Sequence, residues 1–222
     1  MTFISDSLNR IKPSATMVIT AKAAQLKREG KKVIGLSSGE PDFDTPDHIK
    51  KAAIDAINKG YTKYTNVEGI PELRQAITDK FKKDNDLSYS IDDVIVGTGG
   101  KQILYNALFS SINNDDEVII PAPYWVSYPD MTLLAGGKPI IVSCSLETDF
   151  KLTAKELEKF VTKKSKWLIL NSPSNPTGAC YSRRELEEIA EVVRRHDNLY
   201  VMTDDIYEHI VYDNFEFFTF AQ

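Results

Sequence analysis

Two adjacent acids, Asp204 and Asp205, follow the apolar run LYVMT (199–203) and precede a second apolar stretch. Burying a carboxylate costs free energy unless a cation or several hydrogen-bond donors meet it, so a positive group is expected close to this pair. An acid that follows a strand can also cap a helix, and that interpretation is favoured for Asp205. Tyr207 comes three residues after Asp204 and could add a phenol to the same site.

A glycine-rich turn, GTGGKQ (97–102), precedes a helical pattern. Free N–H groups at the start of a helix, together with Lys101, would bind an anion, most plausibly a phosphate. The match to named nucleotide motifs is poor, because Gln102 replaces the third glycine of G-x-G-x-x-G and Ile95 replaces the first glycine of a P-loop. A plain strand-to-helix turn explains this stretch equally well.

Two further stretches could contribute to a ligand site. Trp125 in PYWVSYP (123–129) could stack on a flat ring, although an aromatic residue at such a place more often belongs to a core or an interface. NSPSNPTG (171–178) could aim the amide of Asn175 at a ligand, although turn chemistry alone would explain its prolines and asparagines.

The elements that position these residues alternate between strands and helices. Five short apolar runs are typical of strands that are covered on both faces: 94–96, 117–120, 138–142, 166–170 and 199–203. Amphipathic helices lie between several of them, and one begins with Ser182 as its N-cap and Glu185 in the capping-box position. Helices opening near Pro46 and Pro71 are also predicted, as is one that ends at Gly30. The pattern predicts an α/β fold in three layers around a mostly parallel sheet.

Ligands of open parallel sheets bind at the carboxyl ends of the strands, which is where the residues singled out above occur. Together they offer a phosphate site, a flat aromatic ring, an amide, an acid and a phenol. Pyridoxal phosphate, a phosphorylated and protonated pyridine, could use all five. The carboxylate of Asp204 would keep the pyridine nitrogen protonated and so make the ring a stronger electron sink.

Composition narrows the class of protein. The chain has 222 residues, a net charge of −5 and scattered rather than clustered basic residues, so a nucleic-acid partner is not expected. No apolar run approaches the roughly 20 residues that span a bilayer, and no signal peptide is evident. The two cysteines are far apart and only three histidines occur, so no metal site is expected. A cytoplasmic enzyme or binding protein is the expected class.

Six blocks occur in an order typical of one enzyme family: SSGEPDFDTP, KYTNVEGIPELR, GTGGKQ, PYWVSYP, NSPSNPTG and DDIYEH. By these blocks the whole chain resembles the fold-type I, class I/II aminotransferases, which use pyridoxal phosphate. It resembles their bacterial aspartate and aspartate/prephenate branch most closely. The resemblance implies that Gly99, Gly100 and Lys101 lie at the cofactor phosphate, and that Trp125 stacks on the ring and contacts the substrate.

The same resemblance assigns roles to the later blocks. Asn175 and Tyr207 would bind the 3-oxygen of the ring, Asn175 would also contact the substrate, and Asp204 would pair with the ring nitrogen. A cis peptide bond is expected between Asn175 and Pro176.

Three assignments fall in the first 64 residues. The resemblance implies that the N–H of Gly39 binds the substrate carboxylate. Tyr64 would reach across a homodimer to the phosphate of the partner subunit. Lys12 resembles a residue linked to the use of prephenate.

The resemblance also predicts how the chain is divided. Residues 1–45 would form an N-terminal arm and the first part of a small domain, and residues 46–222 would belong to the large cofactor-binding domain. The Schiff-base lysine of the family would lie beyond Gln222, so no catalytic lysine is assigned, and these 222 residues by themselves are expected to be inactive. Two strands of the large sheet would also lie beyond Gln222. Residues 94–96 should therefore lack a neighbour, and 199–203 should form an exposed edge.

The expected function is transfer of the amino group of aspartate, or of glutamate or arogenate, to a 2-oxo acid such as 2-oxoglutarate or prephenate. Its partners would be these small molecules and a second copy of the chain, with no membrane and no nucleic acid. The alternative is a non-catalytic fragment that at most binds the cofactor or a partner subunit. A nucleotide-binding α/β protein is disfavoured by the poor glycine motifs.

Overall fold

The computed structural model describes residues 3–36, 39 and 41–222. The chain divides into two compact units. The larger unit contains residues 68–222 together with the described residues before Lys12, and the smaller unit contains residues 12–67. The smaller unit begins at Lys12 and ends at Val67, so neither of its ends lies at residue 45. The domain boundary expected at residue 45 stays a prediction.

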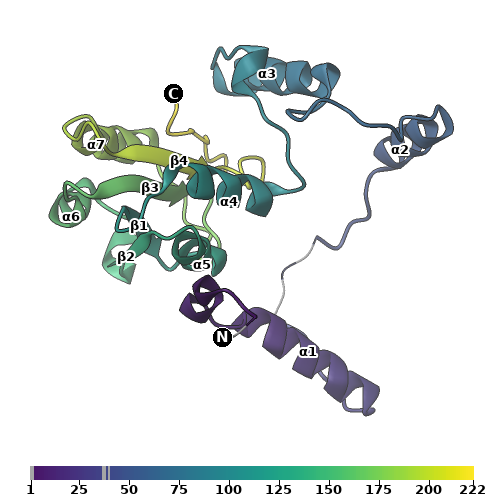
Figure 1. Cartoon of the computed structure of the whole chain (residues 1–222), viewed down its shortest axis with the longest axis horizontal. Helices are drawn as coiled ribbons and strands as arrows, with labels where there is room; N and C mark the ends of the chain where they lie inside the picture. Colours follow the sequence, from purple (N-terminus) through teal and green to yellow (C-terminus); the bar gives the residue numbers. More distant parts are fainter. Residues whose placement is uncertain (1–2, 37–38, 40) are drawn as a thin grey trace. The chain divides into compact units, whose positions relative to one another are not determined.

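Four parallel strands form the sheet of the larger unit (Figure 1). They are β1 (Glu117–Ala122), β2 (Lys138–Ser143), β3 (Ser165–Asn171) and β4 (Tyr200–Asp204). Their order is β2-β1-β3-β4, and every neighbouring pair is parallel. The α/β fold with a parallel sheet is thus confirmed. β4 lies at one edge, where the side chain of Tyr200 is exposed, as the resemblance predicted for this strand.

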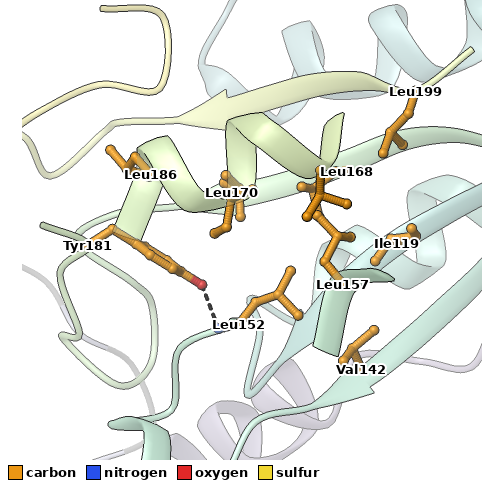
Figure 2. Packing of buried hydrophobic residues seen from close by; sticks show 11 residues of the cluster. Ile119, Val142, Leu152, Leu157, Leu168, Leu170, Tyr181, Leu186 and Leu199 are labelled. Atoms are coloured by element: carbon orange, nitrogen blue, oxygen red, sulfur yellow. Dashed lines mark hydrogen bonds between the residues drawn. The ribbon is translucent and has the colours of Figure 1, made fainter. Parts of the chain in front are cut away.

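Successive residues of a strand point to opposite faces of the sheet, so each face carries its own apolar side chains. Helices cover both faces. Ile119, Leu168 and Leu170 pack on one face with α6 (Ala154–Phe160) and α7 (Arg183–Val193), as Figure 2 shows. Val118, Ile120 and Ile169 pack on the other face with α4 (Gly100–Ser111) and α5 (Ser127–Leu134). The predicted three layers are therefore present in the larger unit.

The remaining helices begin and end close to the predicted signals. α1 (Ala15–Arg28) is followed by Gly30, which has a φ of 79°, and α2 (Asp47–Asn58) begins directly after Pro46. α3 (Pro71–Asn85) carries its proline in the first turn. Three short 3-10 helices complete the described elements: η1 (Asp6–Arg10), η2 (Ile91–Asp93) and η3 (Leu146–Thr148). None of the helices in the described ranges is long and apolar enough to cross a membrane.

The strand predicted at 94–96 is not formed. The N–H of Val96 donates to the carbonyl oxygen of Glu68 at 2.9 Å, and no strand of the described chain pairs with this segment. A strand requires a neighbour to satisfy its backbone groups, so an apolar sequence is not sufficient by itself. The strand expected at 94–96 is therefore a wrong prediction.

The start of α7 has the predicted capping box. The side chain of Ser182 accepts a hydrogen bond from the N–H of Glu185, and the N–H of Ser182 donates to the Glu185 carboxylate at 2.7 Å. Nζ of Lys151 lies 2.6 Å from the same carboxylate. This ion pair ties the chain before α6 to the first turn of α7.

The capping carboxylate should make the stability depend on pH. Burial alone would raise the pKa of Glu185, but hydrogen bonds from Lys151 and Ser182 outweigh burial and hold the pKa below its ordinary 4.5. A group with a lowered folded pKa stabilises the fold above its unfolded pKa, and that contribution is lost as the pH falls through the folded pKa. We expect Glu185→Gln to flatten the loss of unfolding free energy below pH 4.5, measured by urea titration across a pH series.

Glu187→Gln is the matched control on the same helix, because Glu187 pairs with Arg183 on an exposed surface. Its pH profile should parallel that of the wild type. A Glu185→Gln profile parallel to the wild type would contradict the role assigned to the ion pair.

Candidate functional site

Most of the site residues predicted from the sequence lie at one of two kinds of place. They lie at or after the carboxyl ends of β1, β3 and β4, or at the start of α4. Parallel strands bring these ends to one edge of the sheet. Within the larger unit, the contacts described next join most of the predicted residues into one continuous row.

Asp204 is the last residue of β4. The hydroxyl of Tyr128 donates to its Oδ2 at 2.7 Å, and the side-chain amide of Asn171 donates to its backbone oxygen at 2.7 Å. Among the described residues, no hydrogen bond reaches the other carboxylate oxygen, Oδ1. Asp204 is therefore oriented through one oxygen, and its other oxygen is left without a hydrogen-bond partner in the described chain.

Tyr128 is almost fully buried, with 2% of its surface exposed. Burial, and then the charge of Asp204, raise the pKa of its hydroxyl far above 10. Tyr128 thus stays protonated and remains a hydrogen-bond donor over the whole physiological range.

The indole of Trp125 packs edge-on against the ring of Tyr128, with centroids 5.4 Å apart and an interplanar angle of 82°. Nζ of Lys101 lies 5.0 Å from the centre of the Trp125 ring. Such a distance is typical of a cation–π contact. The start of α4 and the indole are therefore adjacent, and Tyr128 links both to Asp204.

The glycine-rich turn leaves space for a ligand to approach the backbone closely. Gly99, with a φ of 82°, is the N-cap of α4, and no heavy atom lies within 4 Å of a Cβ built at Gly99 or Gly100. In the described part of the chain, no side chain caps the N–H groups of Gly100 and Lys101. An open helix N-terminus beside a lysine can bind a phosphate group.

The loop NSPSNPTG holds Asn175 through its backbone. The N–H of Asn175 donates to the Oδ1 of Asn171 at 2.7 Å, and the predicted cis peptide bond between Asn175 and Pro176 is present. The side-chain amide of Asn175 makes no hydrogen bond with the described residues. Together with Tyr207 it lines an open groove.

Asp205 does not cap a helix, contrary to the sequence prediction. The described chain forms turns rather than a helix after β4. The carboxylate of Asp205 accepts hydrogen bonds from the hydroxyls of Thr203 and Thr219. Burial raises its pKa in spite of these two donors. Asp205 thus fastens a later segment of the chain, while Asp204 faces the site.

The three residues predicted in the first 64 positions lie in the smaller unit. The side chains of Lys12 and Tyr64 and the backbone of Gly39 are exposed there. Their assigned contacts with substrate and cofactor stay predictions.

Sequence reasoning missed two members of the row, Tyr128 and Asn171. Tyr128 lies three residues after Trp125 in the same block, and Asn171 is the first residue of NSPSNPTG. Both residues lie inside motifs singled out from the sequence. Their hydrogen bonds to Asp204 join distant parts of the chain, so only the folded structure reveals them.

The arrangement fits a flat, cationic and phosphorylated ring. One oxygen of Asp204 is free for a protonated nitrogen, the indole of Trp125 can cover a ring face, and the start of α4 is open to an anion. Pyridoxal phosphate has these three features.

Comparison with known proteins gives the family. The chain belongs to the aminotransferase class I and II family, whose model matches residues 31–221. The chain is 59% identical over 222 residues to the "Probable aspartate/prephenate aminotransferase" of Rickettsia bellii, covering all of this chain and 56% of that protein. It is 60% identical, with the same coverage, to the "Aspartate/prephenate aminotransferase" of Cereibacter sphaeroides.

A solved structure agrees with the relatives. The crystal structure of the aspartate aminotransferase from Rhizobium meliloti superposes with a TM-score of 0.96 at 49% identity, covering all of this chain and 55% of that chain. The chain thus spans about half the length of the relatives it matches.

Proposed function

We propose that the natural polypeptide containing these 222 residues transfers the amino group of aspartate to a 2-oxo acid, using pyridoxal phosphate. The observation that carries the proposal is the Asp204 carboxylate, fixed by Tyr128 and open on its other oxygen. Membership in the aminotransferase family and the names of the relatives support the reaction and its amino donor.

Asp204 supplies the negative charge that favours a protonated pyridine nitrogen. When bound, pyridoxal phosphate supplies an electron sink for the negative charge that forms at the substrate α-carbon. Tyr128 orients the carboxylate, so that little reorganisation is required when the substrate binds. The charge of Asp204 and the direction of its free oxygen are therefore the chain's main contributions to the chemistry.

The other residues of the row bind and orient. Trp125 covers one face of the ring and borders the substrate. The turn at Gly99 leads the backbone to the phosphate, and the open N–H groups of Gly100 and Lys101, with the ammonium group of Lys101, hold it.

The groove beside the loop supplies polar contacts. Asn175 and Tyr207 line it, and the amide of one and the phenol of the other donate to the ring 3-oxygen. Asn175 also contacts the substrate.

The smaller unit contributes to specificity and assembly in this proposal. The N–H of Gly39 binds the substrate carboxylate, and Lys12 favours prephenate as an acceptor. Prephenate as a substrate is supported by the names of two relatives. Tyr64 reaches the phosphate of the partner subunit in a homodimer.

Both cysteines, Cys144 and Cys180, are free, which fits a reducing compartment such as the cytoplasm.

Cofactor binding tests the proposal. These 222 residues contain two tryptophans, so Trp167→Phe leaves Trp125 as the only indole among them. We expect titration with pyridoxal phosphate to quench the fluorescence of Trp167→Phe with the affinity of the wild type, because a stacked ring quenches its neighbour.

Trp125→Phe is the matched variant, and its affinity, measured by equilibrium dialysis, should fall by roughly three- to tenfold because part of the stacking area is lost. Equal affinity of Trp125→Phe and the wild type would contradict the placement of the ring on this indole.

A further inference from the structure

Tyr207 lies in a hydrogen-bonded turn after β4. The N–H of Glu208 donates to the oxygen of Asp205 at 2.9 Å, and the N–H of Ile210 donates to the oxygen of Tyr207 at 2.8 Å. The Tyr207 hydroxyl makes no hydrogen bond with any residue in the described ranges. The direction of this phenol must therefore be fixed by the backbone of the turn and by the neighbours that anchor it.

The first anchor is Asp205, which accepts from the hydroxyls of Thr203 and Thr219. It connects the beginning of the turn to the end of β4 and to a segment 14 residues later. Asp205 holds only the first residue of the turn, so this anchor alone would leave the turn able to pivot.

The second anchor is Glu208, on the other side of Tyr207. Its Oε1 lies 2.5 Å from the Nζ of Lys80, and its Oε2 accepts from the side-chain amide of Asn85 at 3.2 Å. The Nζ of Lys80 also donates to the Oδ1 of Asn85 at 2.6 Å. Each of the three side chains thus contacts the other two, and the last turns of α3 are joined to the turn after β4.

Two members of the triangle of Lys80, Asn85 and Glu208 are largely shielded from solvent. Asn85 is 3% exposed, and the side chain of Glu208 is 16% exposed. Burial alone would raise the pKa of Glu208, but Lys80 and Asn85 outweigh burial and keep the pKa below its ordinary value. The carboxylate is therefore charged at neutral pH, and the contact is a charge-assisted one, which is stronger than a neutral hydrogen bond.

We propose that Glu208, held by Lys80 and Asn85, is a positioning residue that aims the phenol of Tyr207 into the groove shared with Asn175. This inference rests on the proposed function, in which Tyr207 binds the 3-oxygen of the cofactor ring. Glu208 lies next to Tyr207 in the chain and faces α3, so its contribution to cofactor binding passes through Tyr207. α3 thereby becomes part of the support of the site.

A double-mutant cycle on cofactor affinity tests the coupling. Glu208→Gln keeps the shape of the side chain but loses the charge that binds Lys80, and Tyr207→Phe removes the phenol. We expect Glu208→Gln to weaken the binding of pyridoxal phosphate by roughly five- to tenfold in the wild-type background. In the Tyr207→Phe background the same change should have almost no effect.

A merely structural role for Glu208 would give a different result. Glu208→Gln would then weaken binding by the same factor in both backgrounds, and this additivity would overturn the proposal. Glu187→Gln serves as the surface control, and its affinity should equal that of the wild type.

Amide hydrogen exchange of residues 205–210 without cofactor separates this inference from the proposed function. We expect exchange in this turn to be about tenfold faster in Glu208→Gln than in the wild type, with β1 and β3 unchanged. Faster exchange in Glu208→Gln, together with a wild-type protein that fails to bind pyridoxal phosphate, would refute the cofactor and leave the anchoring of the turn supported. Unchanged exchange in a protein that does bind the cofactor would overturn the positioning role alone.

Discussion

Asp204→Asn is expected to lower the rate of amino transfer by about 10²- to 10³-fold, the range seen when one preorganised electrostatic partner is removed. The amide keeps the size of the carboxylate and can still accept the hydrogen bond from Tyr128. It carries no charge, however, so it no longer favours a protonated ring nitrogen. Steady-state kinetics of the natural polypeptide with aspartate and 2-oxoglutarate give the rate, and thermal unfolding should show a fold that is largely intact.

Asp205→Asn is the matched control, because it makes the same chemical change one residue further along. The Asp205 carboxylate accepts from two threonine hydroxyls, and an amide nitrogen cannot accept. We expect this variant to lose about 1–3 kcal/mol of unfolding free energy while retaining most of its activity. Wild-type activity in Asp204→Asn, or equal losses of activity in the two variants, would contradict the assignment.

Leu168→Ala is expected to lower the free energy of unfolding by about 3–4 kcal/mol. Leu168 lies on β3, an interior strand of the sheet, and none of its surface is exposed. It packs within the cluster formed with α6 and α7 (Figure 2). Truncation removes buried methyl groups and leaves a cavity that strands on both sides prevent from closing.

Leu146→Ala is the corresponding surface change, since Leu146 is 70% exposed, and its effect should stay within about 0.5 kcal/mol. Denaturant unfolding followed by circular dichroism measures both variants. A loss below about 1 kcal/mol in Leu168→Ala would show that this cluster is not the core of the larger unit.

Strand composition was a good guide for the two interior strands of the sheet. β1 and β3 read as apolar runs because helices cover both faces of the sheet there, and local composition carries that signal. Residues 94–96 have the same composition but form no strand. Pairing depends on a neighbour elsewhere in the chain, which no local pattern records.

Helix starts could be predicted because their signals are local in the sequence, whereas the pairing of residues 94–96 depends on a distant neighbour. The capping box of Ser182 and Glu185 is a contact between residues three apart, so its signal lies in the sequence itself. The N-cap prediction at Asp205 was wrong because its carboxylate binds hydroxyl groups instead of the start of a helix. One of these hydroxyl groups belongs to Thr219, 14 residues away, so no local pattern records the contact.

The candidate site shows the same limit. The types of Trp125, Asn175 and Asp204, placed at or after the ends of strands, led to the prediction of a flat and cationic ligand, which stays a prediction. The hydrogen bond between Tyr128 and Asp204 spans 76 residues of sequence, so it became visible only in the folded chain. Side chains that orient a functional group are harder to predict than the group itself, because their role depends on geometry rather than on residue type.

The transfer of ¹⁵N from aspartate to 2-oxoglutarate tests the account most directly. The natural polypeptide is incubated with pyridoxal phosphate, [¹⁵N]aspartate and 2-oxoglutarate, and the product is analysed by mass spectrometry. We predict [¹⁵N]glutamate, formed at a rate that requires the cofactor and that Asp204→Asn lowers by about 10²-fold or more. Unlabelled glutamate alone, or no glutamate from a protein that has bound the cofactor, would contradict the proposed function.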